Sequence, residues 1–526
     1  MNTIETLARH KRAARLAKLP IALAIFFLLI TWLLARVSAP FAQSAAPDEF
    51  FVDPYLQLGN NNRPDQLELL WVANRNYDKW RVEIENATMD KWRVEQAPIT
   101  SIVLTPHRAF LYQCRLKGLT PGETFQYRIM KNDKEAFHAR ALAGKKSGQS
   151  YRVVLFGDMG ANTQGQRKVA FQISQAKPDL TVLLGDIVYD FGLYSEYLDK
   201  FFPIYNCSTA SPEGGIPLLR SVPTVAVLGN HDVALGDNPQ GVNLDKFPDG
   251  LAFFDVWSLP LNGPKSDGQT TNVPRLLGTK ARTDEYLKAA HDQYPRMANY
   301  SFDYGDAHWL VLDANPYMNW TDAALRSWVS KDLANAKAAK WKFVCFHQPG
   351  FSLDVKHSKE QRMRLLSDLF EKGGVDLVFS GHAHNYQRSF PLRFKAKEEK
   401  GRPAINPDGT VDGDCTLDKH FDGGAVTVPE GIIYLVSGGG GASLYPSAET
   451  KDPTAKRVFT DKFISNTHSF TVLDVSVSSL KVSQISEDGA VLDSFIVSHG
   501  IVAKTAPLPS SEKSPARSAS GKTAHY

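Results

Sequence analysis

Cysteine is scarce in this chain, with four residues among 526. Their spacing shows no evident disulfide framework, so the sequence does not indicate a fold held together by cross-links. Cys345 lies in a predicted central strand, two residues before a histidine, and we expect a buried thiol there. Cys207 and Cys415 lie in predicted loops and could pair, a question that the sequence leaves open.

An excess of charge of one sign is also lacking from the main part of the chain. The formal charge is +4, but residues 46–500 hold 50 basic and 54 acidic side chains and carry −4. The positive charge is concentrated in residues 1–45 and 501–526. This distribution excludes the basic surface typical of nucleic-acid-binding proteins, so we expect no nucleic-acid partner.

The apolar run at residues 21–34 is too short for an ordinary membrane span. Basic residues precede it and small residues from Ser38 to Ala46 follow it. This pattern predicts a signal peptide within residues 1–46 or, if the segment is not cleaved, an N-terminal membrane anchor. Either interpretation implies export to the periplasm, the cell exterior or the secretory pathway, with membrane contact only through this segment.

The length predicts about two to four domains. Residues 503–526 are rich in Ser, Pro, Ala and Lys, and we expect a disordered tail there. Residues 50–145 have β-type patterning with a Pro121-Gly122 turn, which predicts a small all-β sandwich. This sandwich contains no recognisable catalytic cluster, so we expect it to be a packing and positioning module.

The pattern changes at Tyr151, after the linker around residues 145–148. Short, nearly all-apolar runs now alternate with helical patterns, as in a sheet that is buried on both faces. The helical patterns lie at residues 165–176, 322–338 and 359–371. Residues 236–298 are irregular and rich in Gly and Pro, which predicts long loops around a pocket mouth. We therefore predict an α/β catalytic domain over residues 150–500.

Metal-ligand residue types follow five of these apolar runs, each within a short glycine-rich or histidine-containing motif. The motifs are Gly157-Asp158-Met159-Gly160, Gly185-Asp186-Ile187-Val188-Tyr189, Gly229-Asn230-His231-Asp232, Val344-Cys345-Phe346-His347 and Gly381-His382-Ala383-His384. Open α/β sheets build their sites where strands end. Each motif alone is common in proteins, but all five in this order predict a site for two adjacent metal ions.

This set of motifs resembles that of the purple acid phosphatases, a branch of the calcineurin-like metallophosphoesterases. Tyr189 is the distinguishing residue, because most metallophosphoesterases lack a tyrosine three positions after the second aspartate. The resemblance implies an α/β (α+β) fold, a four-layer metallophosphoesterase β-sandwich flanked by helices. It also implies that the preceding all-β sandwich is a fibronectin-type-III-like domain.

The resemblance further implies which residues bind each ion. The ligands of an iron(III) ion (Fe3+) are Asp158, Tyr189 and His384. The ligands of a divalent ion are Asn230, His347 and His382. Asp186 bridges the two. The divalent ion could be Zn2+, Mn2+ or Fe2+, because all three accept imidazole and oxygen ligands.

Three further residues are predicted to serve catalysis. His231 follows ligand Asn230 and His357 lies ten positions after His347, and the resemblance places both beside the substrate. They could donate a proton to the leaving group, and Asp232 could orient the His231 ring. The alternatives are that His357 is an exposed loop residue and that Asp232 only stabilises its turn.

These features predict an exported dinuclear-metal acid phosphatase that hydrolyses phosphate monoesters by in-line attack of a metal-bound hydroxide. We expect its partners to be small phosphorylated molecules. The motifs also fit a phosphodiesterase or nucleotide pyrophosphatase, since both reactions are attacks on phosphorus. A binding protein that retains a catalytic fold is a third possibility, which the complete ligand set disfavours.

Overall fold

The structure is a computed structural model that describes residues 50–60, 63–74, 79–86, 91–104, 109–234, 241–264, 273–448 and 458–500. The predicted export segment (1–46) and C-terminal tail (503–526) lie outside these ranges. Within them, no helix combines the length and the apolar character that a membrane crossing requires.

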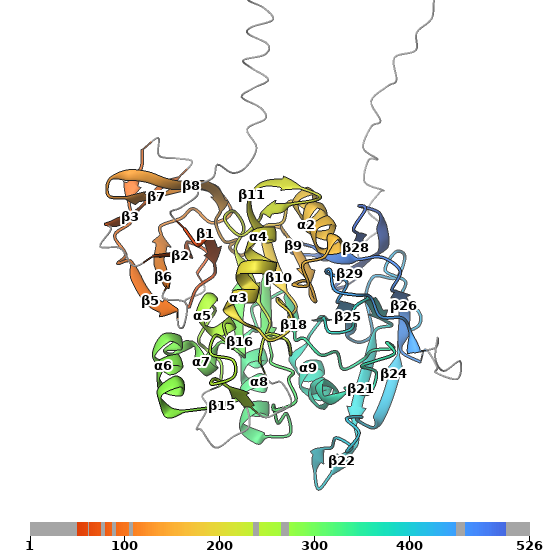
Figure 1. The fold of residues 1–526 in the computed structure, drawn as a ribbon. Helices are drawn as coiled ribbons and strands as arrows, with labels where there is room; N and C mark the ends of the chain where they lie inside the picture. Colours follow the sequence, from red (N-terminus) through yellow and green to blue (C-terminus); the bar gives the residue numbers. More distant parts are fainter. Residues whose placement is uncertain are drawn as a thin grey trace, which may run out of the picture.

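The N-terminal region is all-β, as predicted, and forms the orange lobe of Figure 1. One group of strands consists of β1 (Val52–Gln57), β2 (Gln66–Asn74), β6 (Ala109–Lys117) and β5 (Thr100–Leu104). The facing group consists of β4 (Arg93–Val94), β3 (Trp80–Asn86), β7 (Thr124–Lys131) and β8 (Lys134–Leu142). Inward aromatic side chains fill the space between them, and Trp71 stacks on Tyr112 with ring centres 5.5 Å apart.

The first of these groups continues into a ten-stranded sheet of the catalytic region. Strand β1 pairs with β13 in parallel, and the order then runs through the centre of Figure 1 to the C-terminal hairpins. The remaining strands of this sheet are β13 (Thr224–Ala226), β10 (Leu180–Leu183), β9 (Tyr151–Phe156), β27 (Ser469–Val475), β28 (Ser479–Ser486) and β29 (Val491–Ser498).

Side chains of the catalytic region hold β1 in place. The Arg220 guanidinium is fully buried and donates to the Asp53 carboxylate at 2.8 Å. The Tyr55 hydroxyl donates to the Val256 carbonyl at 2.7 Å. Removing β1 would leave the Val256 carbonyl without a donor and the buried Arg220 charge without its carboxylate, which is costly.

A seven-stranded sheet packs against the ten-stranded one. Its strands, in spatial order, are β16 (Tyr300–Tyr304), β17 (Ala307–Val311), β18 (Trp341–Cys345), β19 (Leu377–Ser380), β25 (Ile433–Ser437), β20 (Tyr386–Ser389) and β26 (Thr460–Ile464). The two sheets share one apolar core. Hydrogen bonds also cross between them, from the Tyr300 hydroxyl to the Ala226 carbonyl and from Thr471 to Ser437.

Helices cover the outer faces of both sheets. Helix α2 (Gln164–Ala176) lies on β27 and β28, and its N-cap Thr163 accepts from the Gln166 amide. Helices α8 (Ala323–Asn335) and α9 (Ser367–Gly373) lie on the other sheet, where Lys342 of β18 donates to the last turn of each. The helix–sheet–sheet–helix order confirms the predicted four layers.

The remaining elements are short and lie between the sheet strands. The helices are α3 (Tyr194–Glu196), α4 (Phe202–Tyr205), α5 (Phe253–Val256), α6 (Lys280–Ala290), α7 (Gln293–Arg296), the π-helical turn η1 (Tyr197–Phe201) and the 3-10 turn η2 (Arg362–Leu366). The strand pairs are β11 (Asn206–Ser211) with β12 (Gly215–Pro217), β14 (Gly241–Asn243) with β15 (Arg275–Leu277), β21 (Leu392–Ala396) with β24 (Gly413–Leu417), and β22 (Glu398–Glu399) with β23 (Arg402–Pro403).

A buried histidine in the seven-stranded sheet makes folding stability depend on pH. Burial lowers the pKa of His308, but hydrogen bonds of 2.8 Å to Asp303 and Asp332 outweigh it and raise the pKa to about 9. Because the folded-state pKa exceeds the unfolded one, this contribution is complete below pH 6.5 and is lost as the pH rises towards 9.

We therefore expect His308→Asn to lower the free energy of unfolding at pH 6. The loss should be limited to roughly 2 kcal/mol, because solvent screens the ion pair with the exposed Asp303. At about pH 9.5 the difference from wild type should be much smaller. Urea unfolding of both proteins at the two pH values measures this. An equal difference at both would contradict the role of the ion pairs.

Candidate metal centre

The predicted ligands follow the C-terminal ends of parallel strands in both sheets. Asp158 follows β9 and Asp186 follows β10, which run parallel in the ten-stranded sheet. His347 follows β18 and His382 follows β19, which run parallel in the seven-stranded sheet. Parallel strands end at the same edge of a sheet, so this arrangement gathers the ligands where the two sheets meet.

The backbone at three of these residues is unusual. Asp158, Asp186 and His382 have φ values of 60°, 49° and 67°, in the left-handed region that non-glycine residues rarely adopt. Such conformations cost on the order of 1–3 kcal/mol each and cluster at functional sites. The loop of Asn230 also approaches closely, since a Cβ on Gly229 would lie 2.1 Å from the Asp186 amide nitrogen. Only glycine fits at that position.

One group of side chains consists of Asp158, Tyr189 and His384. The Tyr189 hydroxyl lies 3.3 Å from Asp158 Oδ1 and 3.1 Å from His384 Nε2. His384 Nε2 lies 3.4 Å from Asp158 Oδ1. Ligand atoms of Asp158, Asp186 and His384 are all close enough to hold one metal ion. The structure thus brings together the three residues predicted to bind iron(III).

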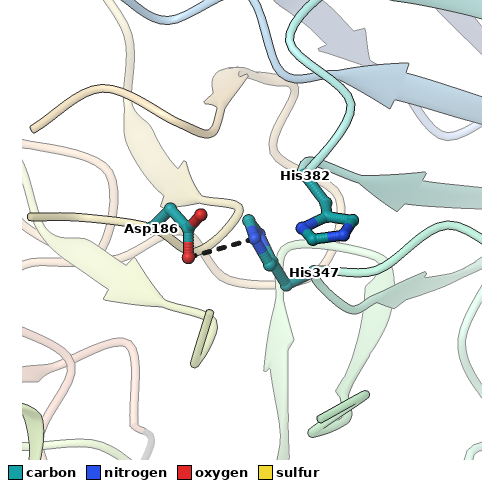
Figure 2. Close-up of side chains that lie close together, drawn as sticks. All are labelled: Asp186, His347 and His382. Carbon is teal, nitrogen blue, oxygen red and sulfur yellow. Dashed lines mark ion pairs between the residues drawn. The ribbon is translucent and has the colours of Figure 1, made fainter. Parts of the chain in front are cut away.

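A second group consists of Asp186, His347 and His382, which Figure 2 shows converging from different strand ends. Asp186 Oδ1 lies 3.1 Å from His347 Nε2, and the His347 and His382 rings are 5.0 Å apart. Ligand atoms of these three residues are also close enough to hold one ion. Asp186 therefore belongs to both groups, as a bridging ligand must.

Buried polar atoms without hydrogen bonds show that the residues fit metal ions. His347 Nδ1 lies 2.7 Å from the Leu184 carbonyl, which only accepts, so Nδ1 carries the proton and Nε2 offers its lone pair. His347 Nε2 and Asn230 Oδ1 are both buried and make no hydrogen bond. In His384, Nδ1 likewise donates to the Ser443 carbonyl, which leaves Nε2 for a metal.

The pKa shifts of Tyr189 and Asp186 also indicate a place for positive charge in the site. Burial raises the pKa of the Tyr189 phenol well above its usual value, and the carboxylates of Asp158 and Asp186 raise it further. Tyr189 is therefore neutral unless a cation lies beside it, and a highly charged ion there would favour the phenolate. Burial alone would raise the pKa of Asp186, but the neighbouring His347, when it carries a second proton on Nε2, holds that pKa far below its usual range.

His231 lies at the edge of the site, with its ring 4.5 Å from that of Tyr189. Its backbone amide donates to Asp186 Oδ1 at 2.8 Å, and its Nδ1 donates to the Asp190 carbonyl at 2.9 Å. The imidazole is thus oriented by a backbone carbonyl. Its Nε2 remains available to a substrate.

Asp232 does not orient the His231 ring, which corrects that part of the prediction. Its buried carboxylate accepts instead from the backbone amides of Ile187 at 2.9 Å and Gly229 at 2.8 Å. These contacts tie the Asp186 loop to the Asn230 loop. The structure therefore favours the alternative role, in which Asp232 stabilises its turn. Burial, together with the nearby Asp186 carboxylate, raises the pKa of Asp232.

His357 lies beside the second group, with its ring 3.8 Å from that of His382. Glu360 joins the two, since its carboxylate contacts His357 Nδ1 at 2.7 Å and His382 Nε2 at 3.0 Å. Burial alone would raise the pKa of Glu360, but these histidines hold it well below its usual range. Sequence reasoning missed Glu360, although its position three residues after His357 could have suggested it.

A tyrosine from a glycine-rich loop also borders the site and was not predicted. The Tyr445 ring stacks on the His384 ring with centres 3.9 Å apart and 15° between the planes. Its backbone amide donates to the His384 carbonyl at 2.9 Å. Tyr445 therefore forms a wall of the metal centre next to the predicted iron ligand.

Comparisons with known proteins agree with this geometry. Residues 151–386 match the calcineurin-like phosphoesterase family. This segment is a calcineurin-like phosphoesterase domain. The match spans all five motifs and all seven predicted ligands, and it confirms the resemblance on which the ligand assignments rest.

Several curated relatives of this chain are named purple acid phosphatases. Purple acid phosphatase 23 of Arabidopsis thaliana is 24% identical over 304 residues, or 53% of this chain and 57% of the relative. A protein named probable inactive purple acid phosphatase 27, from the same plant, is 24% identical over 74% of this chain and 58% of its own length. The chain thus spans little more than half of the length of these relatives.

The fold agrees with that of a solved purple acid phosphatase from yellow lupin seeds. The TM-score is 0.60 at 19% sequence identity, over 86% of this chain and 74% of the lupin chain. At this identity the match shows the fold. The chain thus has the fold of this phosphatase, and its described residues contain three groups of candidate metal ligands, the third being His357, Glu360 and His382.

Proposed function

We propose that this protein is an exported acid phosphatase that hydrolyses phosphate monoesters at a dinuclear metal centre. The observation that carries the proposal is the shared carboxylate of Asp186, which belongs to two ligand groups. Two adjacent cations polarise a phosphoryl group, activate water for attack on phosphorus and stabilise the charge that develops on the leaving oxygen.

We propose iron(III) next to Tyr189 and a divalent ion next to His347 and His382. A phenolate and carboxylates are hard, anionic ligands that suit a trivalent ion, whereas two imidazoles and an amide suit Zn2+, Mn2+ or Fe2+. A trivalent ion lowers the pKa of nearby water more than a divalent one. Activity should therefore extend into mildly acidic solution.

The chain's own residues hold the substrate and handle the proton. His231 and His357 lie on either side of the ligand groups, each with one ring nitrogen fixed by an acceptor. The other nitrogen of each is free to donate to a leaving oxygen or to a phosphoryl oxygen. Asp232 fixes the loop that carries His231, and Glu360 fixes the ring of His357.

The export part of the proposal rests on the N-terminal segment alone. A basic stretch, the apolar run 21–34 and the small residues after it are the parts of a secretory signal. Fractionation of cells that express the full chain, with N-terminal sequencing of the product, tests export and cleavage together.

A substrate panel tests the reaction. The metal-loaded protein is assayed against an aryl monoester, an alkyl monoester, a diester and a nucleotide between about pH 4 and pH 8. We expect the highest kcat/KM for a monoester and an optimum below pH 7. A preference for the diester would favour the phosphodiesterase alternative, and metal binding without turnover of any substrate would favour a binding protein.

Colour tests the place of iron(III). If Tyr189 binds it as a phenolate, charge transfer from ligand to metal gives a visible absorption band, and the protein is pink to purple. Tyr189→Phe removes the phenolate oxygen but keeps the ring, so the band should vanish while the fold remains. Absorption spectra, circular dichroism and iron analysis of both proteins measure this. A colourless wild type with a full complement of iron would reject the assignment of Tyr189.

A further inference from the structure

A buried asparagine outside the predicted ligand set lies between two ligand loops. Asn315 follows β17 by four residues and is fully buried. Its Nδ2 donates to the Gly229 carbonyl at 3.2 Å, directly before predicted ligand Asn230. Its Oδ1 accepts from Nε2 of Gln348 at 3.0 Å, directly after predicted ligand His347. These two hydrogen bonds form an amide relay that joins the surroundings of one ligand to those of another.

The direction of the amide relay follows from the chemistry of its end. The Gly229 carbonyl can only accept, so Asn315 must turn its NH2 group towards it. The Asn315 oxygen then faces Gln348, which must in turn present its own NH2 group. Turning either amide round would bring two acceptors together, which is unfavourable. The amide relay therefore has one arrangement, and it leaves Gln348 Oε1 buried without a hydrogen bond in the part of the chain that the structure describes.

The backbone of Asn315 is itself held in place. Its amide donates to Asp313 Oδ1 at 2.9 Å, and the Tyr317 hydroxyl donates to the other oxygen of that buried carboxylate at 2.7 Å. The Arg362 guanidinium donates to the Asn315 carbonyl at 3.2 Å. Both polar groups of the Asn315 backbone thus have partners in the seven-stranded half of the catalytic region, and its side chain projects from a fixed point.

The peptide that Asn315 contacts is restrained from other sides as well. The Gly229 amide donates to the Asp232 carboxylate at 2.8 Å, and a Cβ on Gly229 would collide with the Asp186 amide nitrogen. Asn315 adds a restraint on the carbonyl. Because a peptide group is planar, fixing the Gly229 carbonyl also fixes the nitrogen of Asn230 and the direction in which that residue begins.

The two ligands beside the amide relay come from different sheets. Asn230 follows β13 of the ten-stranded sheet, and His347 follows β18 of the seven-stranded sheet. Their atoms Oδ1 and Nε2 are buried and make no hydrogen bond. Two such atoms bind one ion well only if each lies within about 0.2 Å of its usual distance from the metal. The bond from Asn315 to Gly229 crosses between the sheets where this precision is needed.

We propose that Asn315 is a positioning residue for the divalent ion. Its hydrogen bond to Gly229 holds Asn230 at the distance from His347 at which both side chains bind one ion. Gln348 fixes which end of the Asn315 amide faces Gly229. The inference rests on the proposed function, because it takes these two ligands as those of the divalent ion. It implies a selective effect, in which loss of the amide relay weakens the divalent ion and leaves iron(III) in place.

Calorimetric titration of the iron-loaded protein with Zn2+ tests this role. Asn315→Leu keeps the branching of the side chain and removes both hydrogen bonds. Loss of a partner that supports a metal ligand typically costs 10–100-fold in affinity, so the Kd for Zn2+ should rise about 10- to 100-fold. The iron content per chain should stay at the wild-type level, a selectivity that a general loss of packing would not produce. An unchanged Kd for Zn2+ in folded Asn315→Leu would overturn the proposal.

Gln348→Met keeps the test decisive if Asn315→Leu does not fold. It removes the amide at the other end of the relay and leaves Asn315 free to turn, so the Kd for Zn2+ should rise about 10-fold. In the double variant the loss should be no larger than in Asn315→Leu alone, because residues that act through one contact are not additive. Additive losses, or a wild-type Kd in Gln348→Met, would overturn the amide relay.

Asn262→Leu is the matched control. Asn262 makes the same two kinds of bond near the surface, since its Nδ2 donates to the Ser301 carbonyl at 2.9 Å and its Oδ1 accepts from the Ser301 amide at 3.0 Å. It belongs to none of the ligand motifs. We expect the Kd for Zn2+ to stay at the wild-type level. A rise equal to that of Asn315→Leu would show a general effect of removing an amide and overturn the specific role.

Binding without substrate separates this inference from the proposed reaction. A selective loss of Zn2+ affinity in Asn315→Leu, in a protein that hydrolyses nothing, would reject the reaction and keep the positioning role. An active wild type with two ions per chain, together with the same Kd for Zn2+ in Asn315→Leu, would reject the role and keep the reaction. A wild type that binds iron but no divalent ion would reject both.

Discussion

Asp186→Asn should lose both metal ions and reduce kcat by at least ~10³-fold. The carboxylate belongs to both ligand groups, and an amide has neither its charge nor its second anionic oxygen. Bound cations supply several kcal/mol of transition-state stabilisation, and each 1.4 kcal/mol is a factor of about ten in rate. Metal analysis per chain, together with kcat for an aryl phosphate, measures both effects.

His382→Ala is the comparison for this prediction. Its imidazole belongs to the group with His347 and is not shared with Asp158 or Tyr189. It should lose mainly the divalent ion and retain iron. Because His382 also contacts Glu360, thermal unfolding of both variants is needed to show that the fold survives. Equal losses of both metals in the two variants would reject the bridging role of Asp186.

His231→Ala and His357→Ala should bind both metals and turn over slowly, with the larger loss for poor leaving groups. An aryl phosphate expels a stable anion that needs little protonation, whereas an alkyl phosphate expels a basic alkoxide that needs a proton. General acid catalysis contributes roughly 10²–10⁴-fold, so the loss on an alkyl ester should be large. The ratio of mutant to wild-type kcat/KM for the two esters, at one pH, measures it.

His138→Ala provides a control for these substitutions. This histidine lies on β8 of the N-terminal region, pairs with Glu135 at the surface and is part of neither ligand group. We expect the ratio of mutant to wild-type kcat/KM to stay near one for both the aryl and the alkyl ester. Equal ratios for the aryl and alkyl esters in His231→Ala would show that His231 supports ligand Asn230 instead of donating a proton.

The buried core of the catalytic region could be predicted from the sequence because its strands are short, apolar and followed at once by ligand motifs. Helix α2 occupies Gln164–Ala176, where the pattern predicted 165–176. The helix predicted at 359–371 begins later, as a 3-10 turn at Arg362, because the preceding residues form the loop of His357 and Glu360. In this loop the contacts of His357 and Glu360 at the site prevent the helix that the apolar periodicity predicts.

Other features depend on contacts that periodicity does not encode. Residues 236–298 were predicted to be loops, but the described part of this segment contains the helices α5 and α6. The partners of Glu360 and Tyr445 lie on loops far away in sequence. Asp232 was misread because its neighbour His231 suggested a contact, whereas its carboxylate faces the backbone of another loop.

The place of β1 in the sheet has a consequence for the synthesis of the chain. Asp53 and its partner Arg220 are separated by 167 positions, and β13, which pairs with β1, is made later still. At roughly 5–20 residues per second, a ribosome needs on the order of ten seconds to extend from one to the other. During that time β1 has an open edge on the side that β13 will occupy, while β2 already covers the other. A nascent chain in this state is a template for wrong strand pairing, and protection of this edge by a chaperone would raise the yield of folded protein.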